Sequence, residues 1–65
     1  MTVHELNIIL GNNIKFYRRL KNMNQPQLAE VLDVSTNQIY DWEGGRKLAR
    51  GSNLVLLAQA LDVEV

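Results

Sequence analysis

Residues 23–43 read MNQPQLAEVLDVSTNQIYDWE, and they contain two helix-start patterns in close succession. Asn24 can cap a helix that begins at the next residue, and Pro26 suits the first turn of that helix. Gln27 stands three residues after the cap, which is the spacing of a capping box, where each side chain bonds the other residue's backbone amide. The pattern predicts a helix over about 25–32.

The same pattern occurs a second time within this stretch. Ser35 is a favourable N-cap residue, and Gln38 again stands three residues after it. The spacing predicts a second helix over about 36–43, which the glycines at positions 44 and 45 end. Two short helices that are joined by only three residues form a tight helix-turn-helix.

Longer segments on both sides of the helix-turn-helix show the apolar spacing of amphipathic helices. The first spans about 3–21, and we expect Gly11 to weaken its helix slightly. Its expected inward stripe comprises Leu6, Leu10, Ile14, Tyr17 and either Leu20 or Lys21. The last helix begins at Ser52 or Asn53 and ends near Leu61. Its expected inward stripe comprises Leu54, Leu57, Ala58 and Leu61. The sequence therefore predicts an all-α fold of four helices.

The composition argues against a catalytic or metal-binding protein. The chain has 65 residues, no cysteine and a single histidine, His4. A zinc site therefore lacks most of its usual ligands, and any nucleophile pair would have to be built around His4. We expect one domain over 1–65 that is not an enzyme and binds no metal or cofactor. The sequence shows no apolar run long enough for a membrane helix and no signal-peptide pattern, so the cytoplasm is the expected compartment.

The charges balance overall but are unevenly distributed along the chain. Seven basic residues match seven acidic ones, and all the basic residues fall within 15–21 and 46–50. If the fold brings these two stretches together, they can form one positive surface for a polyanion. The alternative is an ordinary solvated surface whose charges serve solubility.

The expected helix over 36–43 has the geometry of a DNA-reading element. A short helix on a tight turn protrudes enough to enter the major groove, which is about 12 Å wide. Ile39 and Trp42 are expected to point to the core. The outward positions are Thr36, Asn37, Tyr40 and Asp41. The amide of Asn37 can pair with adenine, and Asp41 can accept a hydrogen bond from cytosine. The alternative is a polar surface helix without a ligand.

From Leu10 to Val63 the chain resembles the Cro/CI-type (XRE-like) helix-turn-helix family of phage and bacterial repressors. The matching stretches are LGNNIKFYRRLKNMNQPQLAEVLDVS, IYDWEGG and NLVLLAQALDV, in the order and spacing of the family. The resemblance implies a lambda-repressor-like domain with four helices, or with five of which the last is truncated. It also implies a sequence-specific double-stranded-DNA-binding transcriptional regulator, with repression as the expected role, that binds its operator as a homodimer.

The resemblance further implies roles for individual residues. The base-reading positions are Thr36, Asn37, Tyr40 and Asp41. The phosphate-contacting positions are Gln25, Gln38, Arg46, Lys47 and Arg50. Gln38 can equally serve as the capping-box partner. Arg18 and Glu43 match a family pair that joins the first helix to the end of the third, and we expect a salt bridge there. The alternative leaves Arg18 free to bind phosphate.

The chain departs from the family pattern in its turn, its loop and its reading helix. Asp33 replaces a glycine, and we expect the turn to survive because Asp tolerates a positive φ. Ala49 stands where proline is common and Gly51 where an apolar residue is usual, so we expect a looser loop. Asp41 brings a negative charge near DNA phosphates and should lower general affinity. The family often has a fifth helix, which we expect to be missing or truncated after Val65.

A second interpretation keeps the fold but gives it a protein partner. Zero net charge and Asp41 also suit a protein-interaction module, such as an antirepressor or an antitoxin-like subunit. We expect Leu56 to be exposed and to form an apolar patch with Val55, Val63 and Val65. Such a patch is a candidate surface for dimerisation.

Overall fold

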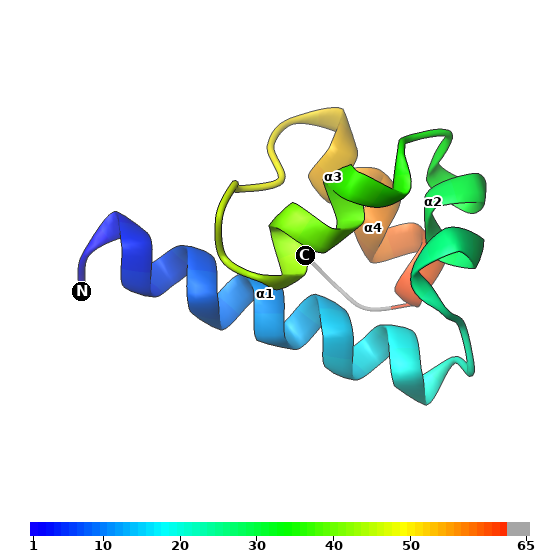
Figure 1. Cartoon of the computed structure of the whole chain (residues 1–65), viewed down its shortest axis with the longest axis horizontal. Helices are drawn as coiled ribbons and strands as arrows, with labels where there is room; N and C mark the ends of the chain where they lie inside the picture. The colour runs from blue at the N-terminus through cyan, green and yellow to red at the C-terminus, as the bar shows by residue number, and fades with distance from the viewer. Residues whose placement is uncertain (63–65) are drawn as a thin grey trace.

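The computed structural model describes residues 1–62 as four helices, so the predicted all-α fold is confirmed (Figure 1). They are α1 (Val3–Leu20), α2 (Gln25–Leu32), α3 (Thr36–Glu43) and α4 (Ser52–Leu61). The long α1 runs along one side of the molecule, and the three shorter helices gather against it (Figure 1). Val63 and Val65, which the sequence placed in an apolar patch, lie outside the described residues.

Side-chain caps start the first three helices, but only one of the two predicted capping boxes is complete. At α2, Gln27 N donates to Asn24 Oδ1 and Asn24 N donates to Gln27 Oε1, both at 2.8 Å. At α3, Gln38 N donates to Ser35 Oγ at 3.2 Å, but within residues 1–62 the return bond from the Ser35 amide is absent. At α3 the predicted capping box is therefore only half formed: the Ser35 cap is present, but the predicted bond from the Gln38 side chain is not.

A complete capping box that the sequence analysis overlooked starts α1. Glu5 N donates to Thr2 Oγ1 at 3.0 Å, and Thr2 N donates to Glu5 Oε1 at 3.2 Å. The signal was present as Thr-x-x-Glu at the start of the chain. The turn between α2 and α3 keeps its tight form although Asp33 stands there, because this residue adopts the left-handed conformation with φ of 56°.

The core lies where the three short helices meet α1. Its buried apolar residues are Leu28, Ala29, Leu32, Ile39, Trp42, Ala49, Leu57 and Leu61. Ile14 and Tyr17 of α1 pack against them and stay partly exposed. Burial of each large apolar side chain stabilises a fold by about 1.5–3 kcal/mol, so this cluster supplies the main driving force for folding. Trp42 is a core residue, as its phase on the helix predicted.

Three apolar residues of the predicted inward stripes are exposed rather than buried. Leu6 is 39% exposed, Leu54 is 38% exposed and Leu20 is 64% exposed. Leu6 lies in the N-terminal part of α1, which extends past the other helices (Figure 1). Leu20 is the last residue of α1, and Lys21, the alternative for its position, is exposed as well. Apolar periodicity showed which face of α1 is inward but not how far the core extends along it.

At Gly11, α1 lies close against the backbone at the end of α3. A Cβ atom at this position would overlap the Trp42 carbonyl oxygen and lie 2.8 Å from the Glu43 carbonyl oxygen. From the sequence, the glycine is expected only to weaken the helix slightly. The structure shows instead that the missing side chain lets the backbone of α1 pack against the C-terminal end of α3.

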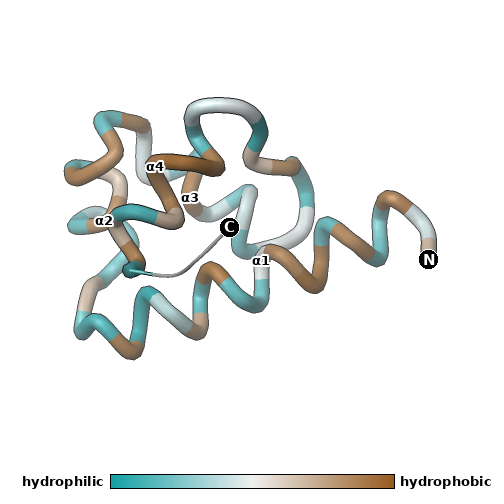
Figure 2. The backbone as a smooth tube through the Cα atoms, turned by 180° about the vertical axis from the view of Figure 1, so that it is seen from behind, coloured by the Kyte–Doolittle hydropathy of each residue, from teal (hydrophilic) through white to brown (hydrophobic). Residues whose placement is uncertain are grey.

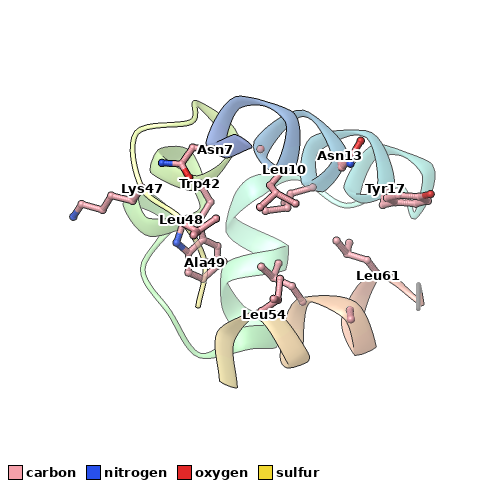
Figure 3. A pocket seen from close by; sticks show the side chains of 14 residues that line it. Asn7, Leu10, Asn13, Tyr17, Trp42, Lys47, Leu48, Ala49, Leu54 and Leu61 are labelled. Atoms are coloured by element: carbon pink, nitrogen blue, oxygen red, sulfur yellow. The ribbon is translucent and has the colours of Figure 1, made fainter. Parts of the chain in front are cut away.

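An apolar groove of about 400 Å³ runs between α1 and α4 (Figure 3). Leu10, Ile14, Tyr17, Leu54 and Leu61 are among its lining residues, and much of α4 is apolar in Figure 2. None of the outward residues of α3 lines this groove. None of the helices within residues 1–62 combines the length and apolarity that a membrane crossing requires.

Candidate nucleic-acid interface

The third helix presents one polar face to solvent and buries the other. Ile39 and Trp42 are buried, whereas Thr36, Asn37 and Tyr40 are exposed, as the helical phase predicted. The side chain of Asp41 is only 26% exposed. This fourth predicted reading residue therefore lies partly covered at the edge of the outward face.

A buried ion pair fixes the end of α3 against the rest of the fold. Arg18 Nε donates to Glu43 Oε2 at 2.6 Å, and Arg18 Nη2 donates to Glu43 Oε1 at 3.0 Å. The two side chains are only 9% and 4% exposed. The third nitrogen, Arg18 Nη1, donates to the Met23 carbonyl at 2.8 Å. Each of the three guanidinium nitrogens of Arg18 thus has a partner inside the protein, and the expected salt bridge is present.

Gln25, a predicted phosphate contact, is tied into the same ion pair. Its Nε2 donates to Glu43 Oε1 at 3.2 Å, and its side chain is half-buried. This bond joins the first residue of α2 to the last residue of α3 and was not foreseen, because only the tertiary arrangement brings the two residues together. One amide hydrogen of Gln25 remains for another acceptor. Gln38, in contrast, makes no side-chain hydrogen bond with residues 1–62, and the return bond of the capping box is not formed.

The basic loop after α3 folds back onto the helix. Arg46 Nε donates to Asp41 Oδ1 at 3.2 Å, and Lys47 Nζ lies 3.7 Å from Asp41 Oδ2. Arg46 Nη2 also donates to the Tyr40 carbonyl at 2.9 Å, and its guanidinium lies 4.1 Å from the centre of the Tyr40 ring. Two predicted phosphate contacts are therefore paired with two predicted reading residues. Opposite charges five and six positions apart, across a Gly-Gly turn, were the available signal.

The other basic residues are divided between paired and unpaired positions. Lys21 Nζ lies 3.4 Å from Asp62 Oδ2 in an exposed pair, so the first basic stretch also has an acidic partner. Arg50 is exposed and forms no ion pair with the residues that the structure describes. The described residues also contain no group of three or more side chains suited to hold a metal ion. The outward face of α3 and the adjoining loop thus form the best candidate site.

A tight pair of short helices, with the second one braced from behind and polar in front, defines the helix-turn-helix class of DNA-binding domain. A helix-turn-helix family model matches residues 14–65. The chain belongs to this family, of the Cro/CI type, and has its lambda-repressor-like fold. The family is one of DNA-binding transcription regulators and not of enzymes.

Known relatives match most of the chain. Control protein C.SmaI of Serratia marcescens is 35% identical over 57 residues, which are 88% of this chain and 68% of the relative. Uncharacterized HTH-type transcriptional regulators of Rickettsia conorii and Rickettsia prowazekii are each 33% identical over 60 residues. Those 60 residues are 92% of this chain but 48% and 46% of the two relatives, so the chain spans about half of their length.

Proposed function

We propose that this protein is a sequence-specific double-stranded-DNA-binding transcriptional regulator and that it acts as a repressor. The disposition of α3 carries the proposal, because Ile39 and Trp42 anchor one face while Thr36, Asn37 and Tyr40 stand free on the other. A helix about 10–12 Å in diameter fits a major groove about 12 Å wide. The names of the relatives, a control protein and transcriptional regulators, support a regulatory role.

In this proposal the exposed first turn of α3 reads base edges. Asn37 is suited to pair with adenine through its amide, and Thr36 can contact a thymine methyl group. Tyr40 lies one turn further along the same face and contacts the next bases. Asp41 accepts a hydrogen bond from a cytosine amine once its cationic partners have moved away.

The phosphate contacts flank this reading face. Gln38 and Arg50, whose side chains have no partner within residues 1–62, bind the DNA backbone, and Gln25 offers its remaining amide hydrogen. Arg46 and Lys47 reach phosphate in exchange for Asp41. These contacts fix the orientation of the protein but carry no sequence information, so specificity rests on α3.

We further propose that the protein binds as a homodimer in the cytoplasm. Helix-turn-helix dimers read two half-sites about one helical turn apart, or about 34–36 Å. The apolar side chains of Leu54, Val55 and Leu56 on α4 are exposed in the single chain and supply a candidate dimer surface. The partner of this homodimer is double-stranded operator DNA in the cytoplasm.

A selection from a random double-stranded DNA library at moderate salt, followed by sequencing, tests the proposal. We expect an enriched two-fold motif with half-sites about 10 base pairs apart. A single enriched half-site would contradict the homodimer. If the folded protein enriches no motif, the proposed function is wrong.

One observation favours a second candidate, a protein-interaction module on the same fold. Asp41 partly neutralises Arg46 and Lys47, which reduces the positive charge that the candidate site shows to DNA. Retention on heparin near neutral pH separates the two candidates. A DNA reader is retained and elutes with salt, because heparin resembles the phosphate backbone in charge. A protein-binding module of zero net charge passes through.

A further inference from the structure

Asp41, Arg46 and Lys47 form a three-residue charge cluster at the C-terminal end of α3. Both carboxylate oxygens of Asp41 have a cationic partner, at 3.2 Å from Arg46 Nε and 3.7 Å from Lys47 Nζ. The side chains of Arg46 and Lys47 are 48% and 71% exposed, and Lys47 points away from the apolar groove (Figure 3). The cations of the cluster are therefore more open to solvent than its carboxylate, which is partly covered.

Arg46 is held in this position by more than the carboxylate. Its guanidinium donates to the Tyr40 carbonyl at 2.9 Å and stacks on the Tyr40 ring at 4.1 Å from its centre. Gly44 makes this possible, because a Cβ atom there would overlap the guanidinium group. In the absence of DNA, the Arg46 guanidinium thus has three partners within the protein: a carboxylate, a carbonyl and an aromatic ring. A DNA phosphate must compete with these partners for it.

We propose that Asp41 is a specificity-determining residue that holds Arg46 and Lys47 as an internal substitute for DNA phosphate. The inference rests on the proposed function, because it concerns how the same site distinguishes its operator from other DNA. The two cations contact the backbone fully only where a base edge offers Asp41 a hydrogen-bond donor in their place.

The physical argument compares two kinds of DNA site. At an arbitrary sequence, phosphates must displace the Asp41 carboxylate from Arg46 and Lys47, which leaves that carboxylate without a cationic partner beside a polyanion. At a site that presents a cytosine amine, the carboxylate exchanges its cations for a neutral donor and the cations bind phosphate. The cost therefore falls mainly on non-specific binding, and specificity increases through repulsion at the wrong sites.

Three variants separate this mechanism from a simple change of net charge. Asp41→Asn removes the anionic centre of the cluster but keeps its size. Glu30→Gln makes the same change in net charge at an exposed position on α2, outside the cluster. Gly44→Ala leaves the net charge unchanged and displaces the Arg46 guanidinium, and its helical φ of −83° accepts alanine without strain. Circular dichroism and thermal melting establish that each variant is folded.

The assay is fluorescence anisotropy with a labelled random-sequence duplex and a labelled duplex that carries the selected motif, over a range of NaCl concentrations. For the random duplex, we expect Asp41→Asn to steepen the slope of log K against log salt by about 0.9 to 1.8, the contribution of one or two further phosphates. Its affinity should rise roughly three- to tenfold. Gly44→Ala should steepen the slope by about 0.9, since it releases Arg46 alone, and Glu30→Gln should leave the slope unchanged.

For the selected duplex, Asp41→Asn should increase the affinity less than it does for the random duplex. The ratio of specific to non-specific affinity should therefore fall by at least about threefold. Equal slopes and equal affinity ratios for Asp41→Asn and Glu30→Gln would overturn the inference. The proposed function would survive that result as long as the wild-type protein binds its motif. If the folded wild-type protein and Glu30→Gln bind neither duplex, the proposed function itself fails. The two failures are thus distinguishable.

Discussion

Removal of Glu43 should strongly destabilise the protein, because it leaves the buried Arg18 without its partner. In Glu43→Ala, Arg18 keeps its positive charge at 9% exposure but loses two charge-assisted hydrogen bonds, and Gln25 loses its acceptor. An uncompensated buried charge of this kind costs about 3–5 kcal/mol. A chain of 65 residues has a total stability of roughly 3–10 kcal/mol, so the variant should lie near the edge of unfolding.

Urea denaturation followed by circular dichroism measures this loss. The exposed pair of Lys21 with Asp62 is the matched control, and Lys21→Ala should change the free energy of unfolding by less than about 1 kcal/mol. The double variant Arg18→Met with Glu43→Leu should recover most of the stability, because apolar side chains of similar volume can replace a buried ion pair. A loss below about 1 kcal/mol in Glu43→Ala, or a double variant no more stable than the single one, would show that the buried ion pair does not hold α3 in place.

Three further predictions concern local features of the fold. Gly11→Ala should lower the free energy of unfolding by about 1–3 kcal/mol in a urea titration, despite the higher helix propensity of alanine, because its Cβ overlaps the Trp42 carbonyl; an increase would contradict the close packing. Asp33→Gly should raise the melting temperature, since glycine removes a left-handed strain of up to about 1 kcal/mol, and a lower melting temperature would show that Asp33 makes a compensating contact. Gln27→Ala should lower the free energy of unfolding by about 1 kcal/mol, because it breaks the capping box of α2. Gln38→Ala should change the free energy of unfolding by less than about 0.5 kcal/mol but weaken DNA binding. Equal losses of stability in the two variants would contradict the half-formed box at α3.

The helix-turn-helix could be predicted from the sequence because its signals are local. The Asn24 and Gln27 pair and the Ser35 cap lie within one turn of the helices that they start, and the helix bounds agree with the structure. The buried face of α3 followed from the spacing of Ile39 and Trp42. The salt bridge between Arg18 and Glu43, which are 25 positions apart, could be predicted only from the resemblance to a family, because spacing does not relate residues so far apart.

The features that the sequence analysis missed depend on tertiary contacts. The need for glycine at position 11 arises only where α1 crosses the end of α3. The bond from Gln25 to Glu43 requires both helices in place. The pairing of Asp41 with Arg46 depends on how the chain folds back after α3, and the charges alone were compatible with free cations that face DNA. Composition and periodicity contain no information on these geometries.

A comparison of the wild-type protein with Asn37→Ala in parallel library selections tests most directly whether α3 reads bases. Asn12→Ala, which truncates an exposed asparagine on α1, is the matched control. We predict that the wild-type protein and the control enrich the same two-fold motif, and that Asn37→Ala loses the preference at one symmetric pair of positions and keeps the rest, because a bidentate base contact is worth about 1–3 kcal/mol. Identical motifs from all three proteins would contradict the account.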